Sequence, residues 1–256
     1  MYDINQNDVT DEFVKCWMSA GRYLDSQKGE LIWLRTHLAQ PMIEHLSFRL
    51  GNQIFFIQIF DVDENLTTPT YNINGLISFS KECKAIPCLL PMKKTDGEWG
   101  VENDGWGLID PETNKEIIPE NFITDESVEM TDWEVQDGAV MIVKSKIEES
   151  GKELMSWQSN PQVHPSIWFV GDNGPEYVVV SSARYPEEEA LPPKNIDDIK
   201  ESNSRMNNVG YFTSVVLASS DDPFDPEAKD NGNFLPLIRG EGFIPKVSEL
   251  IPLTLN

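Results

Sequence analysis

A mostly apolar run at residues 210–219 constrains the fold of this chain more than any other feature. Its residues favour extended structure, and they do not alternate regularly with polar residues. Such a strand is typical of the centre of a sheet, where other elements cover both faces. We therefore predict a layered α+β domain built around this strand.

Helical and extended patterns alternate in the segments before this run. Thr131 and Glu134 have the spacing of a capping box, which predicts that a helix begins here and continues to about Ser150. Asn195 caps a second predicted helix, which follows two prolines. Strands are predicted between the two helices at 153–157, 166–170 and 177–182. The order from 131 to 219 is thus helix, three strands, helix and strand.

The first part of the chain predicts helices packed on a mostly antiparallel sheet. Apolar residues at helical spacing indicate a helix at 8–26 and a shorter one at 30–39. Gly51-Asn52 has the composition of a two-residue hairpin turn between strands. Strands are predicted at 46–50, 53–60, 75–80 and 85–90, followed by a hairpin with a buried tryptophan within 97–122.

We expect the chain to form two parts. Residues 1–124 form the helix-and-sheet part, and residues 125–256 form a three-layer αβββαβ part. The second part ends in an irregular segment that wraps the surface, with one late strand at 242–247. A length of 256 residues suits one large domain or two small ones.

Several classes of protein are disfavoured by simple features. No window approaches the roughly 18 consecutive apolar residues that a membrane-spanning helix needs. The N-terminus lacks the basic and apolar regions of a secretory signal. The three cysteines, Cys16, Cys83 and Cys88, are odd in number and poorly spaced for zinc. Reduced thiols in a cytoplasmic protein are therefore expected.

The net charge of −23 is spread evenly along the chain. Residues 1–127 hold 10 basic and 21 acidic side chains, and residues 128–256 hold 10 and 22. This distribution indicates a solvated anionic surface rather than an acidic tail. Binding to nucleic acid is disfavoured, because neutralising phosphates requires clustered Lys and Arg. Mimicry of a nucleic acid is the alternative reading of the same charge.

The element order from 131 to 219 resembles the αβββαβ core of the PD-(D/E)XK nuclease superfamily. Glu134 and Asp137 stand on the first helix, where that family often has an acidic residue. The segment 164–167 stands where an Asp begins the second strand. The segment 177–184 stands where a Glu-x-Lys strand ends, and that strand is often followed by Arg. The resemblance covers roughly the middle third of the chain and implies this fold.

The catalytic residues of that superfamily are not matched. Its members need an Asp and a Glu on Mg²⁺ and a Lys near the attacking water. The Asp position holds Ser166, and the Glu position falls on Val179 or Val180. The Lys position falls on Ser181 or Ser182. Valine does not bind metal and serine supplies no ammonium, so the resemblance argues against nuclease activity.

We expect a non-catalytic binding or protein-interaction module, because no reactive constellation accompanies the predicted fold. No catalytic motif, cofactor site or metal site is expected, and the partner is expected to be a protein. Arg next to aromatic residues is typical of interface centres. The candidate residues of a cleft or interface are Glu134, Asp137, His164, Arg184, Tyr185, Asp222 and Arg239.

The alternative is a metal-dependent nuclease-like enzyme whose active site has migrated. In that case Glu134 and Asp137 would converge with His164 in one cleft. The acidic loop at 221–225 would supply further carboxylates. This loop follows the apolar strand, and α/β sheets place ligands beyond the carboxyl ends of their strands.

Overall fold

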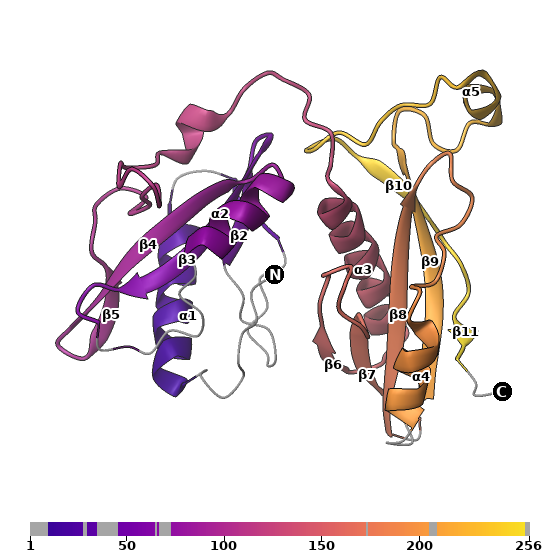
Figure 1. Ribbon diagram of the computed structural model, residues 1–256, viewed down its shortest axis with the longest axis horizontal. Helices are drawn as coiled ribbons and strands as arrows, with labels where there is room; N and C mark the ends of the chain where they lie inside the picture. The colour runs from indigo at the N-terminus through magenta and orange to yellow at the C-terminus, as the bar shows by residue number, and fades with distance from the viewer. Residues whose placement is uncertain are drawn as a thin grey trace. The chain divides into compact units, whose positions relative to one another are not determined.

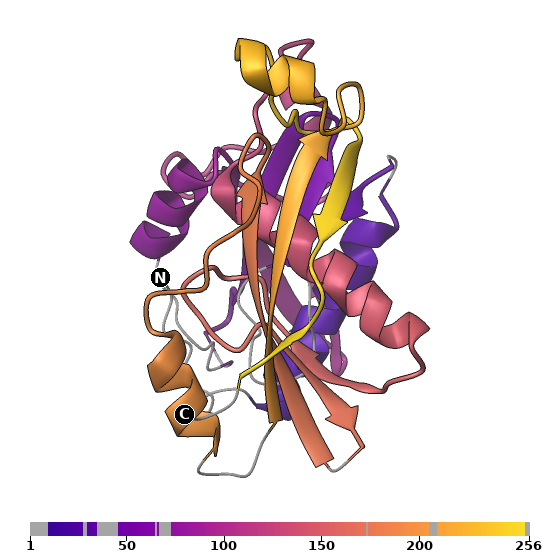
Figure 2. The ribbon, with the colours of Figure 1, turned by 90° about the vertical axis from the view of Figure 1, so that its right-hand side faces the viewer.

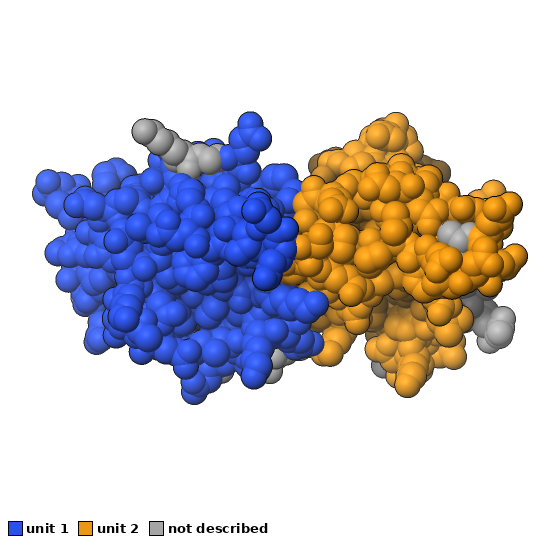
Figure 3. Space-filling view, turned by 90° about the horizontal axis from the view of Figure 1, so that it is seen from above, with its two compact units in different colours: residues 1–126 blue, residues 127–256 orange. Residues whose placement is uncertain are grey.

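The chain forms two compact units, residues 1–126 and residues 127–256 (Figure 3). A computed structural model describes residues 10–27, 30–34, 46–64, 66, 73–172, 174–204 and 209–253. The sequence analysis placed the boundary after residue 124. Each unit contains helices and a sheet with both parallel and antiparallel pairs, so the fold class is α+β as predicted.

In the described part of unit 1, the sheet has five strands in the order β1-β2-β3-β4-β5. Strands β2 to β5 are labelled in Figure 1. The elements are α1 (Asp11–Asp25), β1 (Ile32–Trp33), β2 (Leu46–Leu50), β3 (Gln53–Asp61), α2 (Ile73–Glu82), β4 (Ile86–Thr95), β5 (Glu98–Val101) and the 3₁₀ helix η2 (Pro119–Phe122). Strands β3 and β4 are parallel, and the other described pairs are antiparallel. The prediction of a mostly antiparallel sheet is confirmed.

Helix α1 covers one face of this sheet. Thr10 caps the helix, since its Oγ1 accepts a hydrogen bond of 3.1 Å from the amide of Phe13. The buried face of α1 includes Phe13, Trp17 and Leu24, which join the same apolar core as Phe48 of β2. The helix predicted at 8–26 is thus confirmed over 11–25, and positions 8 and 9 lie outside the described residues.

The short helix predicted at 30–39 is wrong where the structure describes it. Ile32 and Trp33 form β1 and pair with β2. The ring of Trp33 packs edge-on against Phe48, with 6.0 Å between ring centroids. This packing outweighs the local helical pattern, because helix propensity is weak compared with tertiary contacts. Positions 35–39 lie outside the described residues.

The strand predicted at 75–80 is also wrong, because these residues belong to α2. A short apolar run does not distinguish a strand from a buried helix. Strands β3 and β4 are parallel, so the chain must cross over between them, and a helix is the usual crossover. Leu76 and Ser80, one helical turn apart, form the buried face of α2.

The predicted buried tryptophan of the 97–122 segment is Trp106. Its indole N–H donates to Glu120 Oε2 at 2.8 Å, and its ring stacks on Phe48 at 5.7 Å. The next residue, Gly107, has a φ of +69°, and a Cβ there would lie 2.3 Å from a methyl carbon of Val101. Only glycine fits this position, since an L side chain would be strained and would also clash.

In the described residues of unit 2, the strand order is β10-β9-β8-β7-β6, and β11 also pairs with β9. The elements are α3 (Asp132–Glu149), β6 (Leu154–Trp157), β7 (Ile167–Gly171), β8 (Gly174–Arg184), α4 (Ile196–Ser204), β9 (Val209–Ser219), α5 (Pro226–Asn231), β10 (Phe243–Val247) and β11 (Ile251–Pro252). Strands β8 and β9 are parallel. The predicted order of helix, three strands, helix and strand is confirmed.

The two long helices of unit 2 cover opposite faces of its sheet (Figure 2). Side chains of β8 alternate between these faces, so Val178 and Val180 pack in the core that includes Val140 of α3. Tyr177 and Val179 pack instead with Ile199 of α4. The predicted three-layer arrangement is therefore present in this unit.

Strand β9 lies inside the sheet, as its apolar sequence predicts. It pairs with β8 on one side and with β10 and β11 on the other. Strand β10 confirms the late strand expected at 242–247. Helix α5 and strand β11 were not predicted, because both are short and lie in proline-containing sequence.

Candidate functional site

A cavity of about 280 Å³ lies beside the C-terminal half of β8 in unit 2. Its walls come from the first turn of α3, the loop before β7, β8 itself and the loop after β8. Its polar lining residues are Asp132, Gln136, His164, Ser181, Ser182 and Arg184. His164 and Arg184 were both candidate residues in the sequence analysis, so the fold brings these two to one cavity.

The cavity exists because β7 is shorter than β8. The register between them extends only to Ile167 opposite Val178. Further along β8, two side chains take the place of strand partners at Val180. Ser166 Oγ accepts a hydrogen bond of 3.1 Å from the Val180 amide, and Gln136 Nε2 donates one of 2.9 Å to the Val180 carbonyl. The Asp position of the nuclease comparison is thus a serine that bonds to the backbone.

Arg184 forms one wall of the cavity. Its guanidinium pairs with Asp132 and donates to the Met130 carbonyl at 2.7 Å. The Asp132 side chain is 89% exposed, so this ion pair contributes only about 0–1 kcal/mol. The Nε–H is buried and has no hydrogen-bond partner among the described residues. A ligand oxygen could therefore replace Asp132 at little cost.

His164 lies in the opposite wall, on the loop before β7. Burial lowers the pKa of its imidazole, and a hydrogen bond with the Pro161 backbone acts in the other direction. The imidazole is therefore neutral at pH 7. Within the described residues, no hydrogen bond joins it to Ser181 or Ser182, so no nucleophile–base pair is present.

Glu134 and Arg239 come together, but in a buried ion pair rather than in the cavity lining. Arg239 Nε and Nη2 each donate to the Glu134 carboxylate at 2.8 Å. Glu134 also accepts from the amide and hydroxyl of Thr131, at 2.8 and 2.9 Å, which completes the predicted capping box. Both carboxylate oxygens are thus engaged in holding the segment around Arg239 to the start of α3.

The remaining candidate residues lie elsewhere in unit 2. Asp137 is buried on α3 and does not line the cavity. Tyr185 packs on the acidic loop: its hydroxyl donates to the Asp225 carbonyl at 2.5 Å, and its ring meets Phe224 edge-on. Asp222 belongs to this loop, where its amide bonds to the carbonyl at the end of β9.

The convergence required by the migrated-site alternative is not found. Across the residues that the structure describes, no three His, Cys, Asp or Glu side chains are grouped so that they could hold a metal ion. Glu134 faces Arg239, and the acidic loop faces Tyr185. Both contacts join residues that are far apart in the sequence, so no local sequence pattern could have predicted them.

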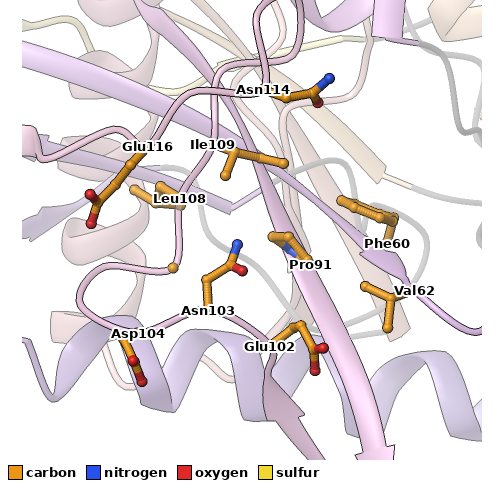
Figure 4. Close-up of a pocket in the computed structure, with 11 residues that line it drawn as sticks. Phe60, Val62, Pro91, Glu102, Asn103, Asp104, Leu108, Ile109, Asn114 and Glu116 are labelled. Carbon is orange, nitrogen blue, oxygen red and sulfur yellow. The ribbon is translucent and has the colours of Figure 1, made fainter.

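A larger cavity, of about 550 Å³, lies in unit 1 between β3, β4 and the loop after β5 (Figure 4). Figure 4 shows the carboxylates of Glu102, Asp104 and Glu116 lying apart from one another around its edge. Glu102 lies 3.4 Å from the ammonium of Lys93. The carboxylates do not converge on one ligand position, so the cavity of unit 2 is the stronger candidate.

Of the residues that line the unit 2 cavity, sequence reasoning proposed only His164 and Arg184, and it missed among others Gln136, Ser182 and Leu191. Gln136 lies on the buried side of α3, and its side-chain amide donates to the Val180 carbonyl of β8. One sequence feature could have indicated the position of the cavity. Along β8 the sequence changes from valines, which are buried, to Ser181-Ser182, which are only half-buried.

A family model described as a domain of unknown function (DUF8840) matches residues 133–253, slightly less than half of the chain. The matched segment runs from α3 to β11 and so lies within unit 2. No curated protein and no solved structure matches the chain. Among the described residues, no helix is long and apolar enough to cross a membrane.

Proposed function

We propose that this protein is a non-catalytic binding module whose ligand site is the cavity beside β8. The observation that carries the proposal is the composition of the cavity lining. Polar side chains from Asp132, His164, Ser182 and Arg184 share the lining with apolar ones such as Val135 and Leu191. Such a lining offers both apolar surface and polar groups that can orient a ligand.

Leu191 gives a second reason to expect a ligand. This residue is 83% exposed and also lines the cavity, so it adds apolar surface at the place where a ligand would sit. The loop that carries it is anchored, because the amide of Ala190 donates to Ser214 Oγ at 2.7 Å. A partner that covered Leu191 would remove this apolar surface from water.

A protein partner in the cytoplasm fits the remaining observations. Cys16, Cys83 and Cys88 are buried and form no disulfide with one another, as expected for a reducing compartment. The net charge of −23 opposes binding to nucleic acid. The buried carboxylate of Glu134 is already neutralised by Arg239, so it is not available as a metal ligand.

A nuclease-like enzyme with a migrated site is the second proposal, although the described structure does not bring Glu134, His164 and the acidic loop together. The observation in its favour is the αβββαβ order with β8 and β9 parallel, together with a cavity at the end of β8. It predicts cleavage of DNA in the presence of Mg²⁺ or Mn²⁺, whereas the binding-module proposal predicts none.

The test compares affinity capture from a native lysate by the wild type, Leu191→Asp and Leu250→Asp, followed by mass spectrometry. Leu250 is 42% exposed and lies outside the cavity, so its variant controls for the added charge. We expect a partner that the wild type and Leu250→Asp retain and that Leu191→Asp loses. Equal capture by all three proteins, no partner at all, or metal-dependent DNA cleavage would contradict the proposal.

A further inference from the structure

We infer that this cavity binds an extended, basic segment of a partner protein, whose main chain adds to the open edge of β8 at Ser182. The inference rests on the proposed function and specifies the kind of ligand. Three observations support it: the backbone groups of Ser182 at the strand edge have no strand partner in the described chain, the cavity opens beside them, and the loop after β8 is acidic.

The first observation is where the pairing of β8 stops. Residues of a strand direct their N–H and C=O groups alternately to the two sides. Both backbone groups of Val180 face the side of β7, because they bond to Ser166 and Gln136. Ser182, two residues further along β8, therefore directs its N–H and C=O to the same side.

Among the described residues, no strand lies on that side at Ser182. In the described chain, the β7–β8 register ends at Val178, and the side-chain bonds of Ser166 and Gln136 reach only Val180. The amide of Tyr185 bonds to Leu217 of β9, which confirms that odd-numbered residues face the other side. The edge is also more accessible here, since residues 177–180 are buried and residues 181–184 are only half-buried.

The second observation is that the loop before β7, which lines the same cavity, keeps its shape through hydrogen bonds of its own. Gln158 is buried and organises the loop: its side-chain amide donates to the carbonyls of Val163 and Pro165, and its Oε1 accepts from the amide of Asn160 at 2.7 Å. The loop thus forms a fixed wall of the cavity. An uncovered strand edge of this kind is a template for pairing with another chain.

The third observation is the charge around the cavity. The loop after β8 carries three consecutive glutamates at 187–189, ending two residues before Leu191, and one of them, Glu188, pairs with Lys229. Unit 2 has 10 basic and 22 acidic residues, a net charge of −12. This charge favours a segment with Lys or Arg flanking an apolar side chain that covers Leu191.

The volume of the cavity agrees with such an occupant. At about 280 Å³ it lies just below the range of roughly 300–1,000 Å³ typical of small-molecule sites. It has room for one side chain and a short stretch of main chain. A ligand carbonyl could also accept from the guanidinium of Arg184 in place of the exposed Asp132.

The experiment uses the full-length protein and a pooled library of blocked hexapeptides, Lys-X-X-X-X-Lys, in which X excludes Pro and Cys. Immobilised wild type selects peptides, and the enriched ones are resynthesised. Binding is then measured for the wild type, Ser182→Pro, Leu191→Asp and the control Leu250→Asp. Ser182→Pro removes the proposed donor but no hydrogen bond to β9, because Ser182 faces the other side.

We expect an enriched peptide to bind Ser182→Pro and Leu191→Asp about tenfold more weakly than the wild type and Leu250→Asp. Amide exchange measured by NMR gives a direct readout: the bound peptide slows exchange at Ser182 about tenfold and leaves Ser181 unchanged. N-methylation of the peptide's central amides is expected to abolish binding.

The inference is overturned if no peptide is enriched, if binding leaves exchange at Ser182 unchanged, or if the N-methylated peptide binds equally well. A thermal melt of Ser182→Pro matching the wild type excludes misfolding, and Leu191→Asp provides the test should that variant unfold. If lysate capture still depends on Leu191 while the peptides fail, the inference fails and the proposed function stands. Failure of the lysate capture itself counts against the proposed function.

Discussion

Removing Arg239 is expected to destabilise unit 2 strongly. Its side chain is 1% exposed and makes two charge-assisted hydrogen bonds of 2.8 Å to Glu134, which is 7% exposed. Arg239→Met would leave the Glu134 carboxylate buried with only its bonds to Thr131. Breaking a buried pair by removing one partner costs about 3–5 kcal/mol. The equilibrium constant for unfolding should therefore rise about a hundredfold or more.

Hydrogen exchange at β9 measures this effect within unit 2, and β3 of unit 1 serves as an internal reference. The matched control is Lys200→Met, because Lys200 pairs at 3.1 Å with Asp197, whose side chain is 88% exposed. This exposed pair should contribute no more than about 1 kcal/mol.

The double variant Glu134→Met with Arg239→Met tests the reasoning further. Replacing both members of a buried pair by apolar residues of similar volume is often neutral. We expect a remaining loss of about 1 kcal/mol, because the glutamate half of the capping box disappears. The reasoning is refuted if Arg239→Met costs no more than Lys200→Met, or if the double variant is less stable than the single one.

Three further outcomes are expected. Gly107→Ala should destabilise unit 1 by about 1–3 kcal/mol in urea denaturation, because of its positive φ and the contact with Val101, whereas Gly100→Ala should cost less than about 1 kcal/mol, since its Cβ would meet open space. Burial raises the pKa of Cys16 from 9.0 to about 12, so this thiol should resist iodoacetamide at pH 8 in the native protein. The stability that the buried neutral thiol contributes should decline as the pH rises from about 9 towards 12, because the unfolded chain loses this proton first. The imidazole of His164 should titrate below pH 6.5 by NMR, and its contribution to stability should decline as the pH falls below 6.5, because only the unfolded chain binds the proton readily there. Equal losses for the two alanine variants, rapid alkylation of Cys16, or a midpoint above 6.5 would contradict these expectations.

Much of unit 2 could be predicted because its signals are local. Thr131 and Glu134 mark the start of α3 through bonds within one helical turn. The apolar sequence of β9 reports burial on both faces, which a central strand requires. Such features depend on neighbouring residues, so the sequence alone carries them.

The errors in unit 1 have a different origin. Ile32 and Trp33 form a strand because they pair with β2 and because the ring of Trp33 packs against Phe48. Residues 75–80 became helical because β3 and β4 are parallel. In both places the local pattern was ambiguous, and contacts with other parts of the unit decided the structure.

The candidate site was predicted in part. Arg184 and His164 were identified and line one cavity, but their roles depend on the point at which β7 ends. Ser182 was considered only as a replacement for a catalytic lysine, whereas the feature that distinguishes it is its backbone. Strand pairing on one side of a residue is a property of the fold, so no motif could have revealed it.

The contact between Glu134 and Arg239 also bears on how the chain is synthesised. The two residues are 105 positions apart, and Glu134 lies near the start of unit 2. While the ribosome makes the intervening residues, the first turn of α3 carries a carboxylate that the finished domain would bury. Unit 2 therefore cannot close as a cooperative whole until its final segments have left the exit tunnel, and a chain truncated before Arg239 is expected to be a substrate for proteases.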